Sequence, residues 1–253
     1  MTVVQVNILG ISGTIIKDGN CDTLVKEALK GAEELGNSVG GVETEFVTLA
    51  DKNIERCRHC QWCIENRAPC KIKDDFYPVY ERLKRCDGFI LGAPSWFRTC
   101  APRIMDFWSR LRFSVFFSNE LRNKVGGAVS LGFFGFGLEN TLDVLQGLAS
   151  VGEIFVARDS ALASTAAFGE RPAYMEHGVL DDIQGIRRVR RVGFKVAEIA
   201  RMIRYATDNG IVLPEEYRMR TRFGAKVRTQ EEARADMELV EGVWRKKKKR
   251  KKR

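Results

Sequence analysis

The sequence lacks the patterns that would place the protein in a membrane, in a secretory route or among the common nucleotide-binding classes. No apolar run approaches the roughly 18 to 20 residues that a helix needs to cross a bilayer, so we expect no membrane span. The opening residues, MTVVQVNILGISG, have neither the basic segment nor the small-residue cleavage site of a secretory signal, and we expect a cytoplasmic location. Neither G-x-G-x-x-G nor G-K-[ST] occurs, which disfavours NAD in a Rossmann site and ATP in a P-loop.

Basic charge is concentrated at one end of the sequence. Arg245 to Arg253 are nine consecutive basic residues; removing nine from 42 Lys and Arg leaves 33, which equals the 33 Asp and Glu, so the rest of the chain is neutral. A like-charged run of this length is usually a solvated tail. The alternative is attraction of RNA, DNA or anionic membrane to this tail and to the arginines of the stretch Arg187–Arg191.

Cysteine is distributed very unevenly. Four of the seven cysteines lie close together in the sequence, at Cys57, Cys60, Cys63 and Cys70. In a chain without a secretory signal, this crowding favours metal or redox chemistry over structural disulfides. His59 and His177 are the only histidines. Because four thiols already complete a ligand set, we expect that His59 does not bind the metal.

Strand and helix patterns alternate along most of the chain. The predicted strands are Val3–Leu9, Thr44–Leu49, Gly88–Gly92, Val125–Leu131 and Ile154–Ala157. The predicted helices are Thr23–Leu35, Pro78–Arg85, Pro102–Leu111, Glu139–Ser150 and Asp181–Tyr205, with a loop at Arg158–Gly178. This alternation predicts an α/β fold with a parallel sheet between helices. We expect one domain at 1–210 and a charged extension, with no core of its own, at 211–253.

Three loops follow predicted strands at their carboxyl ends, where open α/β sheets bind ligands. The first, Gly10–Cys21, offers small side chains, hydroxyls and backbone N–H groups beside a helix N-terminus, which suits either a phosphate or an ordinary turn. The second, Ala93–Pro102, places Trp96 and Phe97 where they would flank a flat heterocycle or pack in the core. The third, Gly132–Gly137, is permissive enough for a ligand to approach its backbone.

The order and spacing of these loops resemble the NADPH-dependent FMN reductase superfamily of flavodoxin-like proteins. The resemblance implies a doubly wound, five-stranded parallel sheet of order 2-1-3-4-5 that binds FMN at the three loops. It implies phosphate contacts from Ser12, Thr14, Asn20 and Cys21, and ring contacts from Pro94, Ser95, Trp96, Phe97, Gly132 and Gly135. Ile15 and Ile16 stand where relatives often have Pro and Arg, and Cys21 where they often have Thr, so either the phosphate is bound more weakly or Lys17 supplies the charge.

The spacing C-x2-C-x2-C-x6-C favours an iron-sulfur cluster. Three thiolates at this spacing wrap one corner of a cubane, whereas a zinc site usually separates two C-x2-C pairs by about a dozen residues or more. We therefore expect Cys57, Cys60, Cys63 and Cys70 to bind a [4Fe-4S] cluster, with structural zinc or redox-active thiols as alternatives. A cysteine-rich insertion after the second strand resembles the iron-sulfur flavoproteins of anaerobic archaea and bacteria.

This resemblance implies a flavin-dependent oxidoreductase. Electrons would pass between a one-electron, ferredoxin-like carrier and FMN, and on to a small acceptor such as oxygen, peroxide or quinone, in a homodimer or tetramer that brings the cluster of one subunit near the FMN of its partner. Since the cofactors would carry the chemistry, no catalytic acid, base or nucleophile is assigned. One alternative is an NAD(P)H-dependent FMN or quinone reductase with a structural zinc site. The other is a nucleic-acid-associated protein that binds through its basic tail.

Overall fold

A computed structural model describes residues 3–118, 120–152, 154–163, 178–211, 230–235, 237–240 and 243–246. His177, most of the predicted loop at 158–178 and residues 247–253 of the basic tail lie outside these ranges. Among the described residues, no helix combines the length and the apolar character needed to cross a membrane.

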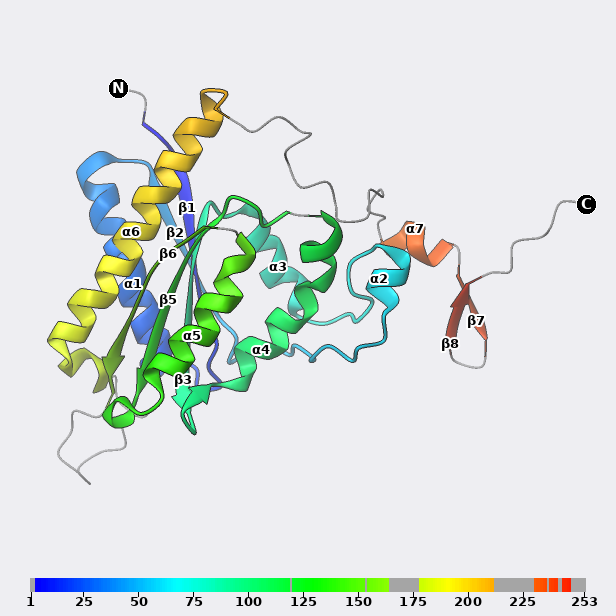
Figure 1. Ribbon diagram of the computed structural model, residues 1–253, viewed down its shortest axis with the longest axis horizontal. Helices are drawn as coiled ribbons and strands as arrows, with labels where there is room; N and C mark the ends of the chain where they lie inside the picture. Colours follow the sequence, from blue (N-terminus) through cyan, green and yellow to red (C-terminus); the bar gives the residue numbers. More distant parts are fainter. Residues whose placement is uncertain are drawn as a thin grey trace, which may run out of the picture.

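Five parallel strands form the centre of the fold (Figure 1). Their spatial order is β2 (Val42–Thr48), β1 (Val6–Ser12), β3 (Gly88–Trp96), β5 (Val125–Gly132) and β6 (Ile154–Leu162). A two-residue strand, β4 (Thr99–Cys100), folds back antiparallel to β3. Without β4, this is the predicted flavodoxin-like order 2-1-3-4-5, which is confirmed. β5 is buried along its whole length, as expected for an apolar strand covered on both faces.

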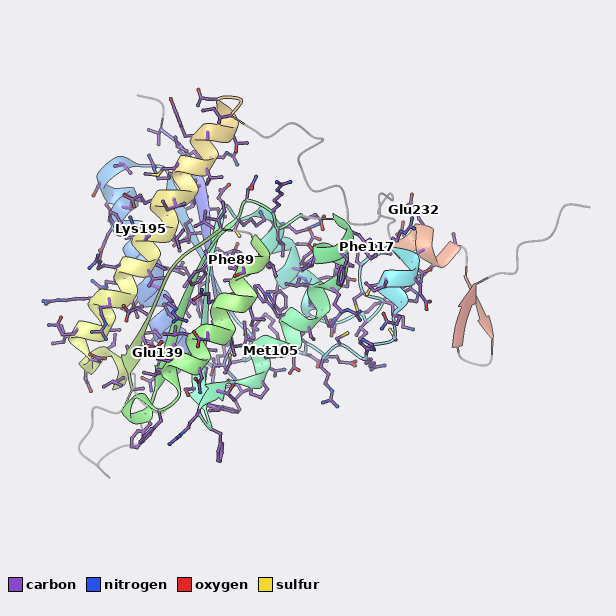
Figure 2. The ribbon with its side chains drawn as sticks, in the orientation of Figure 1. Phe89, Met105, Phe117, Glu139, Lys195 and Glu232 are labelled. Atoms are coloured by element: carbon purple, nitrogen blue, oxygen red, sulfur yellow. The ribbon has the colours of Figure 1, made fainter. Side chains whose placement is uncertain are left out.

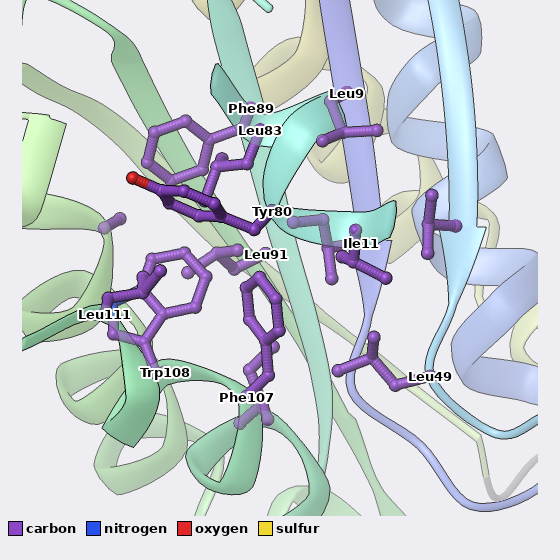
Figure 3. Close-up of a cluster of buried hydrophobic side chains, with 14 of the residues drawn as sticks. Leu9, Ile11, Leu49, Tyr80, Leu83, Phe89, Leu91, Phe107, Trp108 and Leu111 are labelled. Atoms are coloured by element: carbon purple, nitrogen blue, oxygen red, sulfur yellow. The ribbon is translucent and has the colours of Figure 1, made fainter. Parts of the chain in front are cut away.

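Helices cover both faces of the sheet. α1 (Asn20–Val39) and α6 (Ile183–Asp208) pack on one face with one core cluster, and α3 (Phe76–Arg85), α4 (Pro102–Trp108) and α5 (Leu138–Ala149) pack on the other (Figure 1). The second cluster is rich in aromatic side chains, and Figure 3 shows Tyr80, Phe107 and Trp108 packed beside Leu91 of β3. These two layers hold the carboxyl ends of the strands in fixed positions.

α1 and α6 approach each other closely because glycine lies at their crossing. A Cβ atom at Gly31 would come within 1.9 Å of the carbonyl oxygen of Arg190, and one at Gly193 within 1.7 Å of that of Ala28. Beside this crossing, the guanidinium of Arg190 in α6 donates to the buried carboxylate of Glu27 in α1 at 2.6 Å. The contact fixes the N-terminal half of α1, which leads back to the ligand-binding edge of the sheet.

β6 extends beyond its prediction. The apolar signal ends near Ala157, but pairing with β5 continues to Leu162, opposite Gly132. The added residues, RDSAL, are mostly polar because β6 is the edge strand of this sheet, and most of its side chains are only partly buried. An edge strand with partly exposed side chains does not show the apolar run by which a central strand is recognised.

Beyond Ile211, the described parts of the 211–253 region are three short elements. They are α7 (Gln230–Ala235) and the hairpin of β7 (Met237–Val240) and β8 (Val243–Lys246). α7 lies beside α2 (Trp62–Asn66), with Glu232 labelled on it (Figures 1 and 2). Ala233 of α7 is fully buried against Trp62 and Ala68. The division into domains at 1–210 and 211–253 stays a prediction.

Candidate functional site

A cavity of about 370 Å³ opens at the carboxyl ends of β1, β3 and β5, and we call it the sheet-edge cavity. β1 and β3 are neighbours whose chain connections leave in opposite directions, and the crevice at such a switch point is where doubly wound sheets bind ligands. The lining is mainly apolar. Seven of the ten residues predicted to contact a flavin line the cavity: Thr14, Asn20, Cys21, Pro94, Ser95, Trp96 and Gly132.

The remaining three predicted contacts lie elsewhere. Ser12 is fully buried beneath the cavity, where its hydroxyl donates to Sγ of Cys21 at 3.3 Å. Phe97 is fully exposed at the tip of the β3–β4 hairpin. Gly135 lies in the short helical turn after β5, with φ of +74°, and does not line the cavity.

Four lining residues have no counterpart among the predicted contacts: Ile16, Leu131, Phe133 and Ala163. Leu131 and Phe133 flank the predicted Gly132, so the glycine-rich motif carried a signal for them. Ala163 directly follows β6. The second half of β6 is mostly polar and does not show the apolar pattern of a buried strand. Ile16 adds an apolar side chain to the lining.

The N-terminus of α1 is the most polar part of the sheet-edge cavity. Gly19 caps the helix without any side-chain hydrogen bond, which leaves backbone N–H groups directed out of the helix end. Asn20 is 4% exposed, and its Oδ1 accepts a hydrogen bond from the backbone N–H of Val179 at 2.9 Å. Its Nδ2 is buried and has no hydrogen-bond partner within the described ranges. A buried unpaired donor beside a free helix N-terminus fits an anion such as a phosphate.

No basic side chain lines the sheet-edge cavity within the part of the chain that the structure describes. Lys17, the predicted cation, instead forms an ion pair with Asp51 at 3.2 Å. Asp22, in the first turn of α1, is fully buried, and its carboxylate accepts a hydrogen bond from the backbone N–H of Asp18 at 2.8 Å. An anion at this end of the cavity would therefore depend on neutral donors and the helix dipole.

Two further cysteines near this edge are neutral, buried thiols. Burial raises the pKa of Cys21 to about 12, an effect that the hydrogen bond from Ser12 only partly opposes. Burial likewise raises the pKa of Cys100 to about 12. Since the thiolate is the reactive form, neither residue is an activated nucleophile at neutral pH.

The second and third loops are joined into one wall. In the β3–β4 hairpin, Phe97 and Arg98 both adopt positive φ, 45° and 64°, which two-residue hairpin turns require and which bulky residues rarely adopt. Ser95 Oγ donates to the carbonyl oxygen of Phe136 at 2.7 Å. A Cβ atom at Gly137 would come within 2.2 Å of Cα of Arg98, so only glycine permits this contact.

The four clustered cysteines lie on a separate stretch, residues 57–70, which we call the cysteine segment. It contains α2 and three residues with positive φ, His59, Gln61 and Arg67, so the backbone reverses repeatedly. All four cysteines are free thiols; Cys60 is exposed and the others are partly buried. The segment shares no residue with the lining of the sheet-edge cavity, and α2 lies far from α1 in Figure 1.

The thiols of the cysteine segment are close enough to influence one another. Burial raises the pKa of Cys63 to about 11, with further raising effects from Cys70, Cys57 and Cys60, while Arg112 acts in the opposite direction. In the described residues, no three His, Cys, Asp or Glu side chains converge into a closed metal site. Four neighbouring soft thiols nevertheless match the donor set of iron-sulfur and zinc centres.

Both ends of the cysteine segment are tied to one buried ion pair. Arg110 and Asp74 are paired, with side chains 0% and 3% exposed. Arg110 also donates to the carbonyl oxygens of Glu55 at 3.3 Å and Ile72 at 3.0 Å, and its guanidinium lies 4.4 Å from the ring centre of Phe76. Asp74 accepts from the backbone N–H of Glu55 at 2.8 Å. Glu55 and Ile72 lie just outside the segment, so the pair closes its base.

A sequence family covers most of this architecture. The family model described as NADPH-dependent FMN reductase matches residues 6–169. The chain belongs to this family. An iron-sulfur flavoprotein of Methanocaldococcus jannaschii is 35% identical over 202 residues, covering 78% of this chain and 98% of the relative. Another, from Archaeoglobus fulgidus, is 29% identical over 209 residues, covering 76% of this chain and 96% of that relative.

The fold of this member of the FMN reductase family also occurs among solved structures. A crystal structure of RosB with a bound 8-demethyl-8-formylriboflavin-5'-phosphate intermediate has a TM-score of 0.60 at 19% identity, covering 87% of this chain and 88% of RosB. At this identity, the likeness shows the fold alone. The predicted resemblance to the FMN reductases and iron-sulfur flavoproteins is confirmed, and the chain is a flavin-dependent oxidoreductase.

Proposed function

We propose that the protein binds FMN in the sheet-edge cavity and a [4Fe-4S] cluster on the cysteine segment, and that it transfers electrons between a one-electron carrier and the flavin. The observation that carries the proposal is the unpaired, buried Nδ2 of Asn20 at the open N-terminus of α1. Such a donor in an otherwise apolar cavity calls for an anionic group attached to an apolar body. A flavin mononucleotide has this composition.

The cavity is suited to both parts of the ligand. Its volume of about 370 Å³ falls in the range of roughly 300 to 1,000 Å³ that is typical of small-molecule sites. Asn20, Thr14 and the free N–H groups of α1 would hold the phosphate. Pro94 and Trp96 would lie along the ring at the other end. Ser12, Phe97 and Gly135 would then shape the loops without contacting the flavin.

The cysteine segment would hold the cluster through Cys57, Cys60, Cys63 and Cys70. Two relatives named as iron-sulfur flavoproteins support this part of the proposal. When bound, the cluster exchanges single electrons and the flavin stores two. Arg110 and Asp74 prepare the segment for binding because they fix its two ends in the core.

Separation of the two sites within one chain favours an oligomer. The cysteine segment and the sheet-edge cavity share no residue, so we propose a homodimer or tetramer in which the segment of one subunit lies beside the cavity of another. A ferredoxin-like carrier is the proposed donor, with NAD(P)H as the alternative that the family description supports. Oxygen, peroxide or quinone is the proposed acceptor, and a cytoplasmic location is part of the same proposal.

The alternatives differ in what the cysteines bind or which surface is used. A reductase with zinc on the same four thiols keeps the flavin site unchanged. Nucleic-acid binding draws little support from the Arg187–Arg191 stretch, because Arg188 pairs with Asp159 at 2.9 Å and Arg190 pairs with Glu27 and Glu34.

Cofactor analysis tests the proposal directly. Protein purified without oxygen is analysed for FMN, iron, acid-labile sulfide and zinc, together with its visible spectrum. The expected result is flavin bands over a broad shoulder that dithionite bleaches, with about four iron and about four sulfide per FMN. FMN with about one zinc and no iron would leave a plain flavin reductase. No bound flavin would overturn the assignment of the cavity.

A further inference from the structure

Arg112 is a partly buried cationic residue that contacts the cysteine segment and has no acidic partner among the residues that the structure describes. It directly follows the short helix Ser109–Leu111, whose Ser109 accepts a hydrogen bond from the backbone N–H of Cys57 at 3.1 Å. Its Nη2 donates to Oε1 of Gln61 at 3.4 Å. Since Gln61 stands between Cys60 and Cys63, this contact places the guanidinium against the cysteine segment.

The hydrogen bonding of Arg112 is incomplete. Its Nη1 is buried and has no hydrogen-bond partner, and no Asp or Glu pairs with it among the described residues. Two positions earlier, Arg110 has its charge balanced by Asp74. A buried guanidinium nitrogen left without an acceptor is unfavourable, and more so in a charged group. Among the described residues, no anionic or hydrogen-bond-accepting group satisfies Nη1 of Arg112.

The metal-loaded cysteine segment would supply that group. Four thiolates carry more negative charge than the iron and sulfide core compensates, and their sulfurs accept hydrogen bonds. Because Arg112 is only partly exposed, solvent screens its charge less than that of a surface arginine.

We propose that Arg112 is the counter-charge of the metal centre on the cysteine segment, a positioning residue that strengthens metal binding and raises the reduction potential of the cluster. The inference rests on the proposed function for its redox part, since it needs a cluster to act on. A fixed positive charge favours the reduced, more negative state of the centre and so shifts its potential upward. Arg112 itself exchanges no electron and no proton.

Arg58 provides a matched control. It also lies within the cysteine segment and carries the same charge, but its side chain is 65% exposed and paired with Glu55. Exposed and already paired charges act weakly at a distance because water and salt screen them. Arg112→Gln and Arg58→Gln therefore remove the same formal charge from two environments that differ in burial and pairing.

The first experiment measures the cluster potential of the intact, loaded protein by dye-mediated titration. We expect the reduction potential of Arg112→Gln to be clearly lower than that of the wild type. The potential of Arg58→Gln should be near the wild-type value, and that of Arg112→Lys closer to the wild-type value than to that of Arg112→Gln. Iron and sulfide content is measured alongside, so that only fully loaded samples are compared. Equal potentials in wild type and Arg112→Gln, or equal shifts in both Gln variants, would overturn the inference.

The second experiment works without a cluster. The full-length protein, reduced and stripped of metal, is titrated with Co²⁺ and followed by its thiolate-to-cobalt absorption bands. We expect Arg112→Gln to weaken Co²⁺ binding about tenfold or more, as loss of an outer-sphere partner does, with Arg58→Gln close to wild type. If wild type binds Co²⁺ but never iron and sulfide, the cluster proposal fails while this arm still tests Arg112. Unchanged Co²⁺ affinity in Arg112→Gln would refute its role as counter-charge.

Discussion

The backbone N–H of Val179 donates a 2.9 Å hydrogen bond to Oδ1 of Asn20, a residue 159 positions earlier in the chain. Val179 lies in the short turn Gly178–Asp181, just before α6, and is fully buried. The bond satisfies the acceptor end of the amide, while the donor end, Nδ2, is buried without a hydrogen-bond partner among the described residues. The approach to α6 therefore fixes the acceptor end of a side chain that lines the sheet-edge cavity.

Replacement of Asn20 should weaken FMN binding through the phosphate. A hydrogen bond to a charged group is worth about 1.5 to 3 kcal/mol, so Asn20→Ala should lower FMN affinity by roughly 10- to 100-fold. Asn20→Asp should lower it further, because a carboxylate would face the phosphate. The measurement is quenching of flavin fluorescence on binding. Riboflavin, which has no phosphate, is the control ligand, and equal losses for riboflavin and FMN would contradict the role assigned to Asn20.

Loss of Arg110 should release the base of the cysteine segment. Arg110→Met leaves the carboxylate of Asp74 buried without its partner, which should reduce the free energy of unfolding by about 3 to 5 kcal/mol. Chemical denaturation of the metal-free protein measures this effect. An unchanged denaturation midpoint would show that the pair contributes nothing to the folded state.

A double variant separates stability from positioning at the same site. In Arg110→Met/Asp74→Leu, an apolar pair replaces the ion pair, and much of the stability should return. The bonds from this pair to the backbone of Glu55 and Ile72 do not return, so the ends of the cysteine segment stay loose. We expect Co²⁺ affinity to remain below that of the wild type. If the double variant binds Co²⁺ as tightly as the wild type, Arg110 contributes to stability alone and does not position the cysteine segment.

The ion pair between Glu27 and Arg190 should make stability depend on pH. Burial alone would raise the pKa of Glu27, but hydrogen bonds from Lys30 and Arg190 outweigh it and hold the pKa below the ordinary value of 4.5. A carboxyl group with a lowered folded-state pKa adds stability that is fully present above its unfolded-state pKa and is lost as pH falls through the folded-state value.

Glu27→Gln tests this dependence. Because Arg190 is partly exposed, we expect the variant to be less stable than wild type by only about 1 kcal/mol at neutral pH. The difference should shrink as pH falls below 4.5. Urea unfolding of both proteins across this range is the measurement. A difference that stays constant with pH would mean that the carboxylate charge is not what stabilises the contact.

Buried central strands and loops rich in small residues were predictable from the sequence, because their signals are local. The apolar run Gly88–Gly92 has the composition of a strand covered on both faces, and the structure places it in β3. The loops around Asn20 and Pro94 meet at one cavity because parallel strands end at one edge of the sheet. Likewise, the crowding of cysteines is a pattern that needs no tertiary information.

Other features depend on contacts between distant residues and left no local signal. Nothing in the sequence pairs Arg110 with Asp74, since charged residues in a polar stretch normally face water. The family resemblance implied that Phe97 lies along a flavin ring, yet the residue occupies a tight hairpin turn with positive φ and is fully exposed. Whether a residue at a strand end lines a cavity or lies beneath it, as Ser12 does, depends on the local direction of its side chain.

α7 should act as a removable cover of the cysteine segment. Ala233 is fully buried against Trp62 and Ala68, and Cys63 packs beside them, so an arginine at position 233 cannot fit without displacing the helix. Because α7 is only six residues long, we expect local opening, with little change in the global denaturation midpoint. Ala233→Arg should therefore red-shift tryptophan fluorescence and speed alkylation of Cys63 in the metal-free protein.

The control places the same side chain two residues away. Glu231 is exposed on α7, so Glu231→Arg should leave both the fluorescence and the alkylation rate near wild type. In a Trp62→Phe background the spectral shift caused by Ala233→Arg should disappear, because Trp62 is the tryptophan that α7 covers. Equal alkylation rates for Ala233→Arg and Glu231→Arg would show that α7 does not protect the segment. Faster alkylation in Ala233→Arg alone would mean that α7 controls the access of small reagents to the proposed cluster site.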